Sequence, residues 1–299
     1  MRSVPPTGQT QLEQILAPAA AAATGILVGA AIVATRSVVD QTGPASLALL
    51  RYLVGFVCLL GPALAAGGMR FERRDVVPIA LLGITQFGIL VVLLNFSLKY
   101  ISSARAALIF ATMPLLAMLI GAVRGEEQLS PARTLGVLLT IVGVGLALGE
   151  RALGPGGGPA AWIGELAAFA SALSGALCSV LYRPYLTRYP TLAVSAFAML
   201  ASDGFLAILA AREGFFVAPP HFGPSGWLAV LFIGLSSGVG YYLWLWALGH
   251  STPTKVTVFL SLSPVTATAL GALLLAEAVS PALLLGLLCV ALGLWLANR

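Results

Sequence analysis

Ten stretches of the chain consist almost entirely of apolar residues. Their approximate limits are 17–35, 45–66, 75–97, 102–122, 131–149, 160–182, 190–211, 225–247, 253–273 and 281–297. A helix needs about 20 apolar residues to cross a hydrocarbon layer of roughly 30 Å. The stretches show no period-two alternation of polar and apolar residues, which excludes transmembrane strands. The pattern predicts an all-α integral membrane protein with ten transmembrane helices.

The scarcity of charge excludes a soluble enzyme. Only 9% of the 299 residues are charged, whereas soluble domains carry about 25%. The net charge of +5 comes from basic residues scattered through short loops, which favours orientation in a bilayer over nucleic-acid binding. The three cysteines lie in separate apolar stretches, so neither a disulfide nor a metal site is predicted. No cofactor is expected either.

When the sequence is shifted by 150 residues, the later part of its first half aligns with the later part of its second half without a gap. The shift aligns Pro114 with Pro264 and Glu127 with Glu277. Each half then holds five stretches, and an odd number of crossings reverses the chain direction, so the two repeats are predicted to be inverted. The predicted segments are a tail at 1–16, a first repeat at 17–150, a Gly/Pro linker at 151–159 and a second repeat at 160–299.

The distribution of Lys and Arg predicts the orientation. With the N-terminus inside, ten basic residues fall in cytoplasmic segments and five outside. Positive residues accumulate in cytoplasmic loops. We therefore expect a multi-pass protein of the cell inner membrane with both termini in the cytoplasm.

Several of these features resemble a known family. Arg51-Tyr52 in the second stretch, the prolines of stretches four and nine, and the joints from Glu127 to Pro131 and from Glu277 to Pro281 resemble the EamA-type ten-helix exporters of the drug/metabolite transporter superfamily. The segment 36–44 is similar to that of bacterial aromatic amino-acid exporters. The resemblance implies export of amino acids and related metabolites. It also implies a central cavity between stretches 1, 3, 4, 6, 8 and 9, with stretches 5 and 10 at the periphery.

Polar side chains within the apolar stretches are candidates for lining that cavity, because they are costly in hydrocarbon. Ser237, Tyr241 and Trp244 follow one another at i, i+4 and i+7, on one helical face. Aromatic rings there would hold an ammonium group by cation–π contact. The other candidates are Gln86, Asn95, Ser171, Thr257 and Ser261. Hydrogen bonding between helices is the alternative role for each hydroxyl group.

Two prolines are predicted to mark moving helices. Pro114 and Pro264 lie in the middle of stretches four and nine, where each would bend the helix axis. Gly121 and Gly271 follow seven residues later. We expect stretches four and nine to act as gates; a static kink is the alternative.

The sequence thus predicts a secondary transporter that exports amino acids by alternating access, with broad selectivity that includes aromatic or large apolar side chains. Its predicted partners are a small-molecule substrate and the lipid bilayer; a monomer and a homodimer both stay open. One alternative is export of drugs or other small metabolites by the same fold. Another is an intramembrane hydrolase, because Gly234 to Gly238 matches GxSxG around Ser236. His250 lies roughly 21 Å further along the same predicted helix, so no catalytic residue is predicted.

Overall fold

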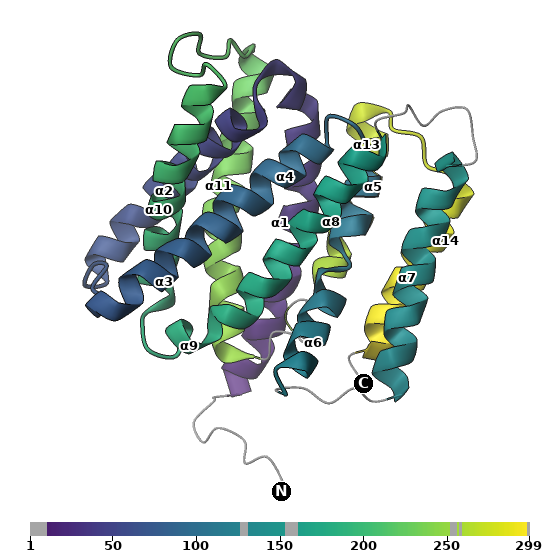
Figure 1. The fold of residues 1–299 in the computed structure, drawn as a ribbon, viewed down its shortest axis with the longest axis horizontal. Helices are drawn as coiled ribbons and strands as arrows, with labels where there is room; N and C mark the ends of the chain where they lie inside the picture. Colours follow the sequence, from purple (N-terminus) through teal and green to yellow (C-terminus); the bar gives the residue numbers. More distant parts are fainter. Residues whose placement is uncertain (1–10, 126–130, 153–160, 252–255, 257–258, 298–299) are drawn as a thin grey trace, which may run out of the picture.

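The computed structural model describes residues 11–125, 131–152, 161–251, 256 and 259–297. Every regular element in these residues is helical (Figure 1). Two short 3-10 helices, η1 and η3, and one π-helix, η2, accompany the α-helices. The elements are α1 (Gln11–Val38), η1 (Val39–Gln41), α2 (Pro44–Ala65), α3 (Arg73–Gly83), η2 (Ile84–Ile89), α4 (Leu90–Ser97), α5 (Ser103–Phe110), α6 (Met113–Val123), α7 (Pro131–Ala152), α8 (Ala161–Leu181), α9 (Arg183–Leu186), α10 (Thr191–Arg212), α11 (Pro224–His250), η3 (Phe259–Ser261), α13 (Leu262–Leu275) and α14 (Pro281–Ala297).

Seven helices within the described residues are long and apolar enough to cross a membrane. They are Leu16–Gln41, Pro44–Ala65, Arg73–Ser97, Ser103–Val123, Ala161–Leu181, Thr191–Arg212 and Pro224–His250. The three remaining predicted stretches correspond to α7 and to the shorter apolar helices α13 and α14. Large apolar side chains such as Val57 and Leu228 are exposed on the outer faces, as contact with lipid requires. The prediction of an all-α, multi-pass membrane protein is confirmed.

Prolines mark where many of the helices start. α2, α7, α11 and α14 begin at Pro44, Pro131, Pro224 and Pro281. The first turn of a helix tolerates proline because its backbone nitrogen needs no hydrogen-bond partner there. The first helix starts ahead of its membrane-crossing part: α1 begins at Gln11, whereas the apolar span begins at Leu16. The good helix formers between Gln11 and Leu16 extend the helix beyond the apolar stretch.

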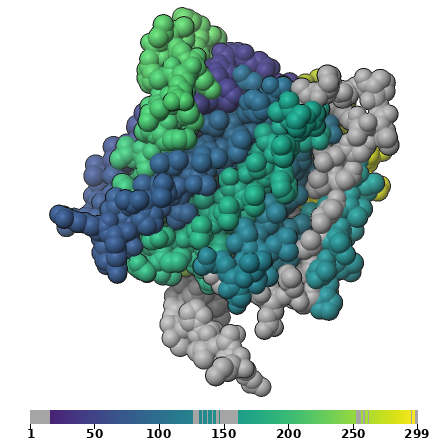
Figure 2. All heavy atoms as spheres, viewed as in Figure 1, coloured from purple at the N-terminus to yellow at the C-terminus, as the bar shows by residue number. Residues whose placement is uncertain are grey.

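The helices pack as a bundle with one pair at its edge. α1 packs against α11 and α13, α8 packs against α4 and α6, and α2 lies between α10 and α11. Figure 2 shows α4 and α8 running side by side across one face. α7 and α14 pack mainly against each other, at one edge of the bundle (Figure 1). The helices that surround the interior are therefore those other than this pair.

Glycines allow two of these helix pairs to approach closely. A Cβ atom on Gly29 of α1 would collide with the backbone oxygen of Ser263 in α13. In α11, a Cβ atom on Gly238 would lie 3.0 Å from the carbonyl oxygen of Gly55 in α2. Small residues at such positions are the usual means of bringing transmembrane backbones together. The α2–α11 contact matters below, because it positions a charged side chain.

The helices that carry Pro114 and Pro264 are interrupted rather than bent in the middle. α5 ends at Phe110 and Pro114 is the second residue of α6, while Pro264 is the third residue of α13, directly after η3. A proline ring clashes with the carbonyl four residues before it, so the α-helix stops ahead of the proline and restarts around it. Pro114 thus lies in the middle of the span Ser103–Val123, as predicted, but at a break between α5 and α6 and not inside one continuous α-helix.

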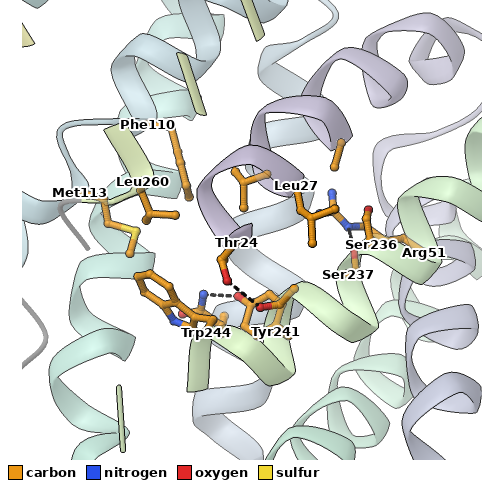
Figure 3. A pocket seen from close by; sticks show the side chains of 14 residues that line it. Thr24, Leu27, Arg51, Phe110, Met113, Ser236, Ser237, Tyr241, Trp244 and Leu260 are labelled. Atoms are coloured by element: carbon orange, nitrogen blue, oxygen red, sulfur yellow. Dashed lines mark hydrogen bonds between the residues drawn. The ribbon is translucent and has the colours of Figure 1, made fainter. Parts of the chain in front are cut away.

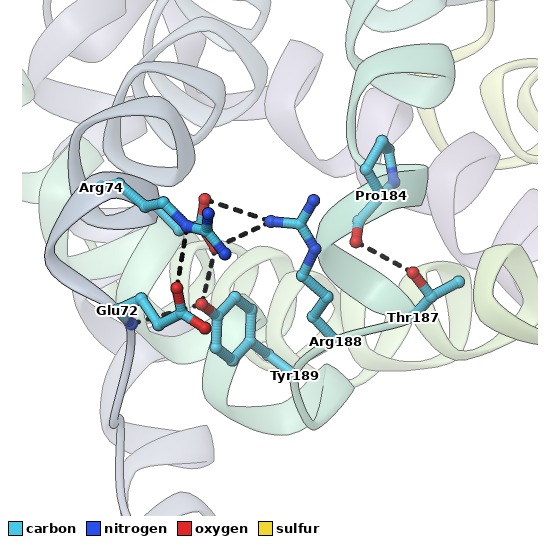
Figure 4. Close-up of polar contacts among 7 residues, drawn as sticks. Glu72, Arg74, Pro184, Thr187, Arg188 and Tyr189 are labelled. Atoms are coloured by element: carbon cyan, nitrogen blue, oxygen red, sulfur yellow. Dashed lines mark hydrogen bonds and ion pairs between the residues drawn. The ribbon is translucent and has the colours of Figure 1, made fainter.

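Polar contacts connect the chain at the end of the bundle where α3 starts (Figure 4). Arg188 donates to Asp75 at 3.0 Å, and the Tyr189 hydroxyl donates to the same carboxylate at 2.6 Å. The backbone nitrogen of Glu72 donates to the Tyr189 oxygen. These bonds join the first turn of α3 to the segment before α10. The hydrogen bond to Asp75, together with burial, raises the pKa of the Tyr189 phenol.

At the opposite end, two carboxylates cap helices that lie far away in the sequence. Glu213 accepts hydrogen bonds from the backbone nitrogens of Ala45 and Ser46 at the start of α2, at 3.0 and 2.8 Å. Glu277 accepts from the backbone nitrogen and the hydroxyl of Ser103 at the start of α5, at 3.1 and 2.5 Å. Negative groups at helix N-termini satisfy free N–H groups and the helix dipole. Both contacts connect the second half of the chain to the first.

Candidate functional site

A cavity of about 50 Å³ lies where helices from both halves of the chain meet. Its lining residues come from α1, α2, η2, α5, α6, α11 and η3, and Figure 3 shows them. Its volume is sufficient for a few ordered water molecules. A larger hollow of about 350 Å³ lies between α1, α11 and α13, but its described lining is apolar except for Ser37. Because polar groups fix the orientation of a ligand, the first cavity is the candidate site.

One face of α11 supplies three side chains to this cavity. Ser237, Tyr241 and Trp244 all line it. Their spacing of four and three residues places them above one another along the helix. Trp244 and Ser237 are largely buried. The structure thus brings together the three residues that the sequence placed on one face.

Gln86 reaches the cavity from the π-helix η2. Its side-chain nitrogen donates to the hydroxyl of Tyr241. A π-helix inserts an extra residue into a helix, which redirects the side chains around it, and such segments often occur at functional sites. The bond fixes the Tyr241 ring, which also packs against Phe87 with 4.1 Å between ring centroids.

Arg51 of α2 also lines the cavity, and sequence reasoning did not include it among the site residues. Its Nε donates to the Ser237 hydroxyl at 2.5 Å, and that hydroxyl donates to the carbonyl of Ile233 at 2.6 Å. The guanidinium carbon lies 5.5 Å from the ring centroid of Tyr52. The close α2–α11 approach at Gly238 makes the bond to Ser237 possible. A charge inside an apolar stretch was the signal that could have identified it.

Two predicted candidates lie elsewhere and hold helices together. Asn95 is fully buried and donates to the carbonyl of Pro44 at 2.9 Å. Ser171 is fully buried and donates to the carbonyl of Leu90 in α4 at 2.8 Å. Neither is among the residues that line the cavity. Their hydrogen bonds belong to helix packing, the alternative role that the sequence had left open.

The predicted candidates of stretch nine are only partly described. Thr257 lies outside the described residues, and Ser261 is described only as the last residue of η3. Leu260, next to it, lines the cavity. Of the predicted gate glycines, Gly121 is buried in α6. A Cβ atom on Gly271 would lie 2.8 Å from the Ser103 hydroxyl oxygen, so this glycine leaves room for the Glu277 cap.

Further lining residues carried no clear signal in the sequence. The Thr24 hydroxyl lies 2.9 Å from the carbonyl of Ala20 and 3.2 Å from that of Gly240, which connects α1 to α11. Phe110 and Met113 line the cavity on either side of the α5–α6 interruption. Apolar residues of this kind are as frequent on lipid-facing surfaces, so composition does not single them out.

The arrangement around Ser236 does not fit a serine hydrolase. Its hydroxyl donates to the carbonyl of Ile233 at 3.0 Å. His250, the histidine of the same helix, contacts the carbonyl of Trp246 through Nδ1 and stacks on that ring. A nucleophilic serine needs a base within hydrogen-bond reach. Within the described residues, no group of three or more His, Cys, Asp or Glu side chains is placed to hold a metal ion.

Comparison with known proteins assigns the family. Residues 16–149 and 162–299 each match the EamA-like transporter family. The chain belongs to this family. The two matches place an EamA segment in each half of the chain, and the resemblance to EamA-type exporters of the drug/metabolite transporter superfamily is confirmed. Transport, and not enzymatic catalysis, is the activity typical of the family.

Individual relatives agree with this assignment. A probable terminal-alkyne amino-acid exporter of Streptantibioticus cattleyicolor is 30% identical over 287 residues, which cover 92% of this chain and 91% of that protein. The aromatic amino acid exporter YddG of Ancylobacter novellus is 31% identical over 225 residues, which cover 74% and 76%. A solved crystal structure aligns with a TM-score of 0.71 and 26% identity, over 97% of both chains. Two of the relatives are thus named as exporters.

Proposed function

We propose that the protein exports amino acids, including aromatic and large apolar ones, across the bacterial inner membrane. Relatives with 30% and 31% identity are named as amino-acid exporters. The observation that carries the proposal is the cavity that Tyr241, Trp244 and Gln86 line together. Aromatic rings beside a few oriented polar groups suit an amphiphilic substrate. Both termini lie in the cytoplasm in this proposal.

The arrangement of the helices supports two inverted repeats of five, at 17–150 and 160–299 on either side of the linker 151–159. Helices in equivalent places of the two halves pack in matched ways. α1 packs against α11 as α8 packs against α4, and α1 packs against α13 as α8 packs against α6. α7 and α14, the last helices of the two halves, pack against each other. This exchange of equivalent contacts is what a two-fold relation between ten helices would produce.

Transport then requires the cavity to open. At about 50 Å³ it is smaller than the roughly 300 Å³ at which pockets for small molecules begin, so the substrate enters only after helices move. The gates in this proposal are the helices that carry Pro114 with Gly121 and Pro264 with Gly271. Their interruptions before each proline lie at Phe110 and Leu260, beside the cavity. Alternating access would move the two gates in turn.

Counterflow in proteoliposomes tests the proposal. The purified full-length chain, loaded with unlabelled phenylalanine, tryptophan or leucine, should accumulate the same labelled amino acid. Trp244→Ala should lower exchange severalfold, because Trp244 forms one wall of the cavity and is 4% exposed. Trp162→Ala is the matched control, since Trp162 is 62% exposed on α8. This variant should exchange amino acids at the wild-type rate.

Two results would contradict the proposal. If no amino acid exchanges while a drug or another metabolite does, the fold carries a different cargo. Phosphorylated molecules are the least suitable alternative substrates, because their negative charge requires cationic side chains. Arg51 is the one cationic residue among the described residues that line the cavity. If Trp244→Ala and Trp162→Ala exchange equally well, the cavity is not the site.

A further inference from the structure

We propose that Arg51 binds the carboxylate of the transported molecule, and that the cavity therefore also accepts apolar monocarboxylates that have no amino group. The proposal rests on the proposed function, because it assumes that the cavity of Figure 3 is the transport site. It extends that function to a second class of substrate. Three observations support it: the state of Arg51, the absence of an acidic partner, and the unequal ends of the cavity.

Arg51 presents unused hydrogen-bond donors. The residue is 8% exposed and lines the cavity. Its Nε is bound to Ser237, but among the described residues no group accepts a hydrogen bond from either of its Nη atoms. A buried cation without a counter-ion is costly, and the planar fork of a guanidinium matches the two oxygens of a carboxylate. The side chain is therefore ready to bind an anion that enters the cavity.

The described residues supply no such anion at the site. None of the described residues that line the cavity is acidic. Asp203 of α10 influences Tyr52 electrostatically, yet the described residues form no Arg51–Asp203 ion pair within 4.0 Å. Arg105, the other buried cation among the described residues, is paired with Glu165 at 2.5 Å. The missing negative charge at Arg51 is thus left for the substrate.

Because no acidic side chain is found among the described lining residues, an ammonium group on the substrate contributes less to binding than a carboxylate does. Among the described lining residues, a substrate ammonium finds aromatic ring faces and neutral oxygens, such as those of Tyr241 and Gln86, but no carboxylate. Cation–π contacts and neutral hydrogen bonds are weaker than a charge-assisted pair. The carboxylate should therefore dominate recognition, and a substrate without the ammonium group should keep most of its affinity.

The two ends of the cavity differ in polarity. Figure 3 shows Arg51 with Ser236 and Ser237 at one end, and Phe110, Met113 and Leu260 at the other. A molecule with its carboxylate at Arg51 would place its tail among these apolar side chains. The fitting ligand class is a monocarboxylate with an aromatic or aliphatic tail.

Two analogues of phenylalanine that keep its ring separate the contributions of the carboxylate and the ammonium group. We would measure how 3-phenylpropionate, which lacks the amino group, and 2-phenylethylamine, which lacks the carboxylate, inhibit phenylalanine counterflow by the wild-type protein. Phenylpropionate should inhibit within about tenfold of phenylalanine, whereas phenylethylamine should be weaker by roughly 10- to 100-fold, the factor that a hydrogen-bonded charge typically contributes. Labelled phenylpropionate should itself be exchanged.

Variants of Arg51 test the same point. Arg51→Gln should remove the preference for phenylpropionate over phenylethylamine, and Arg51→Lys, which keeps the charge but loses the fork, should weaken phenylpropionate about tenfold. Arg36→Gln is the matched control, because Arg36 is paired with Asp40 at the end of α1. Equal thermal unfolding of the variants and wild type would show that they fold. Wild-type inhibition needs no variant and tests whether the carboxylate dominates recognition, whereas the variants test whether Arg51 is the residue responsible.

The outcomes are distinguishable. If phenylalanine is exchanged and phenylethylamine inhibits as well as phenylpropionate or better, the carboxylate site is refuted while the proposed function stands. If phenylalanine and all other amino acids fail to exchange, the proposed function fails, and uptake of phenylpropionate then decides whether the carboxylate site survives. If Arg51→Gln leaves the preference between the two analogues unchanged, Arg51 is not the residue responsible.

Discussion

Removing the Glu277 carboxylate should loosen the connection between the two halves of the chain. Glu277 lies between α13 and α14 and accepts two hydrogen bonds from Ser103, at 3.1 and 2.5 Å. Ser103 is fully buried at the first position of α5. Glu277→Ala would leave the backbone N–H and the hydroxyl of Ser103 without these acceptors. Glu277→Gln would keep one oxygen acceptor but lose the charge.

The expected cost follows from these two bonds. A hydrogen bond to a charged group contributes about 1.5–3 kcal/mol when buried, and a carboxylate at a helix N-terminus adds up to about 1 kcal/mol. Glu277 is only half-buried, so solvent reduces both terms. We expect Glu277→Ala to lower the free energy of unfolding by about 2 kcal/mol and Glu277→Gln by about half of that. For a chain of 299 residues the larger loss corresponds to a Tm decrease of about 3 °C.

Thermal unfolding of the detergent-purified protein measures the effect. Glu72→Ala is the matched control, because the Glu72 carboxylate is paired with Arg74 and both side chains are exposed, at 59% and 71%. Exposed pairs contribute about 0–1 kcal/mol, so the control should unfold close to the wild-type temperature. Identical Tm values for Glu277→Ala, Glu72→Ala and the wild type would refute the reasoning that the cap joins the halves.

Three further predictions concern other contacts. Gly29→Leu should prevent α1 from approaching Ser263 and lower stability by about 1–3 kcal/mol, seen as a lower Tm; an unchanged Tm would show that the two helices can separate freely. Tyr189 stabilises the folded state through its bond to Asp75, which raises the pKa of the phenol above 10. That contribution is complete below pH 10 and is lost as the pH rises through the folded-state value, so wild-type Tm should fall more steeply above pH 10 than that of Tyr189→Phe; parallel curves would contradict it. Asp203 is 8% exposed, and neither carboxylate oxygen has a hydrogen-bond partner among the described residues. Asp203→Asn should therefore unfold at or above the wild-type Tm at pH 7, and a clear decrease would mean that the carboxylate is stabilised there.

The order and extent of the helices could be predicted from the sequence because the bilayer imposes a length. A segment that crosses hydrocarbon must satisfy its own backbone hydrogen bonds and remain apolar for about 20 residues. Helix α2 illustrates this: the predicted stretch 45–66 and the observed Pro44–Ala65 differ by one residue at each end. The starts at Pro131 and Pro281 follow from the same local rules. None of these features depends on a distant part of the chain.

The α11 face could be predicted for a similar reason. Ser237, Tyr241 and Trp244 share a face because of helix geometry alone, and the structure places all three at the cavity. Asn95 and Ser171 satisfied the same polarity criterion, but they bond to carbonyls of neighbouring helices. A polar side chain in a transmembrane helix indicates that this position faces the protein interior. It does not indicate whether the side chain lines a cavity or packs against a neighbouring helix.

Tertiary structure alone decided which groups meet. Arg51 and Ser237 are 186 residues apart in sequence, and Gln86 and Tyr241 are 155 apart. Their contacts exist because α2 packs closely on α11 and because a π-helix turns Gln86 toward α11. The apolar pattern of a helix reflects the lipid around it, and lipid surrounds every transmembrane helix alike. Which helix packs against which depends instead on shape and on small residues along the whole interface. The membrane class and the helix limits could therefore be predicted from the sequence. The cavity, and an Arg51 that has no acidic partner among the described residues, result only from the packing of the helices.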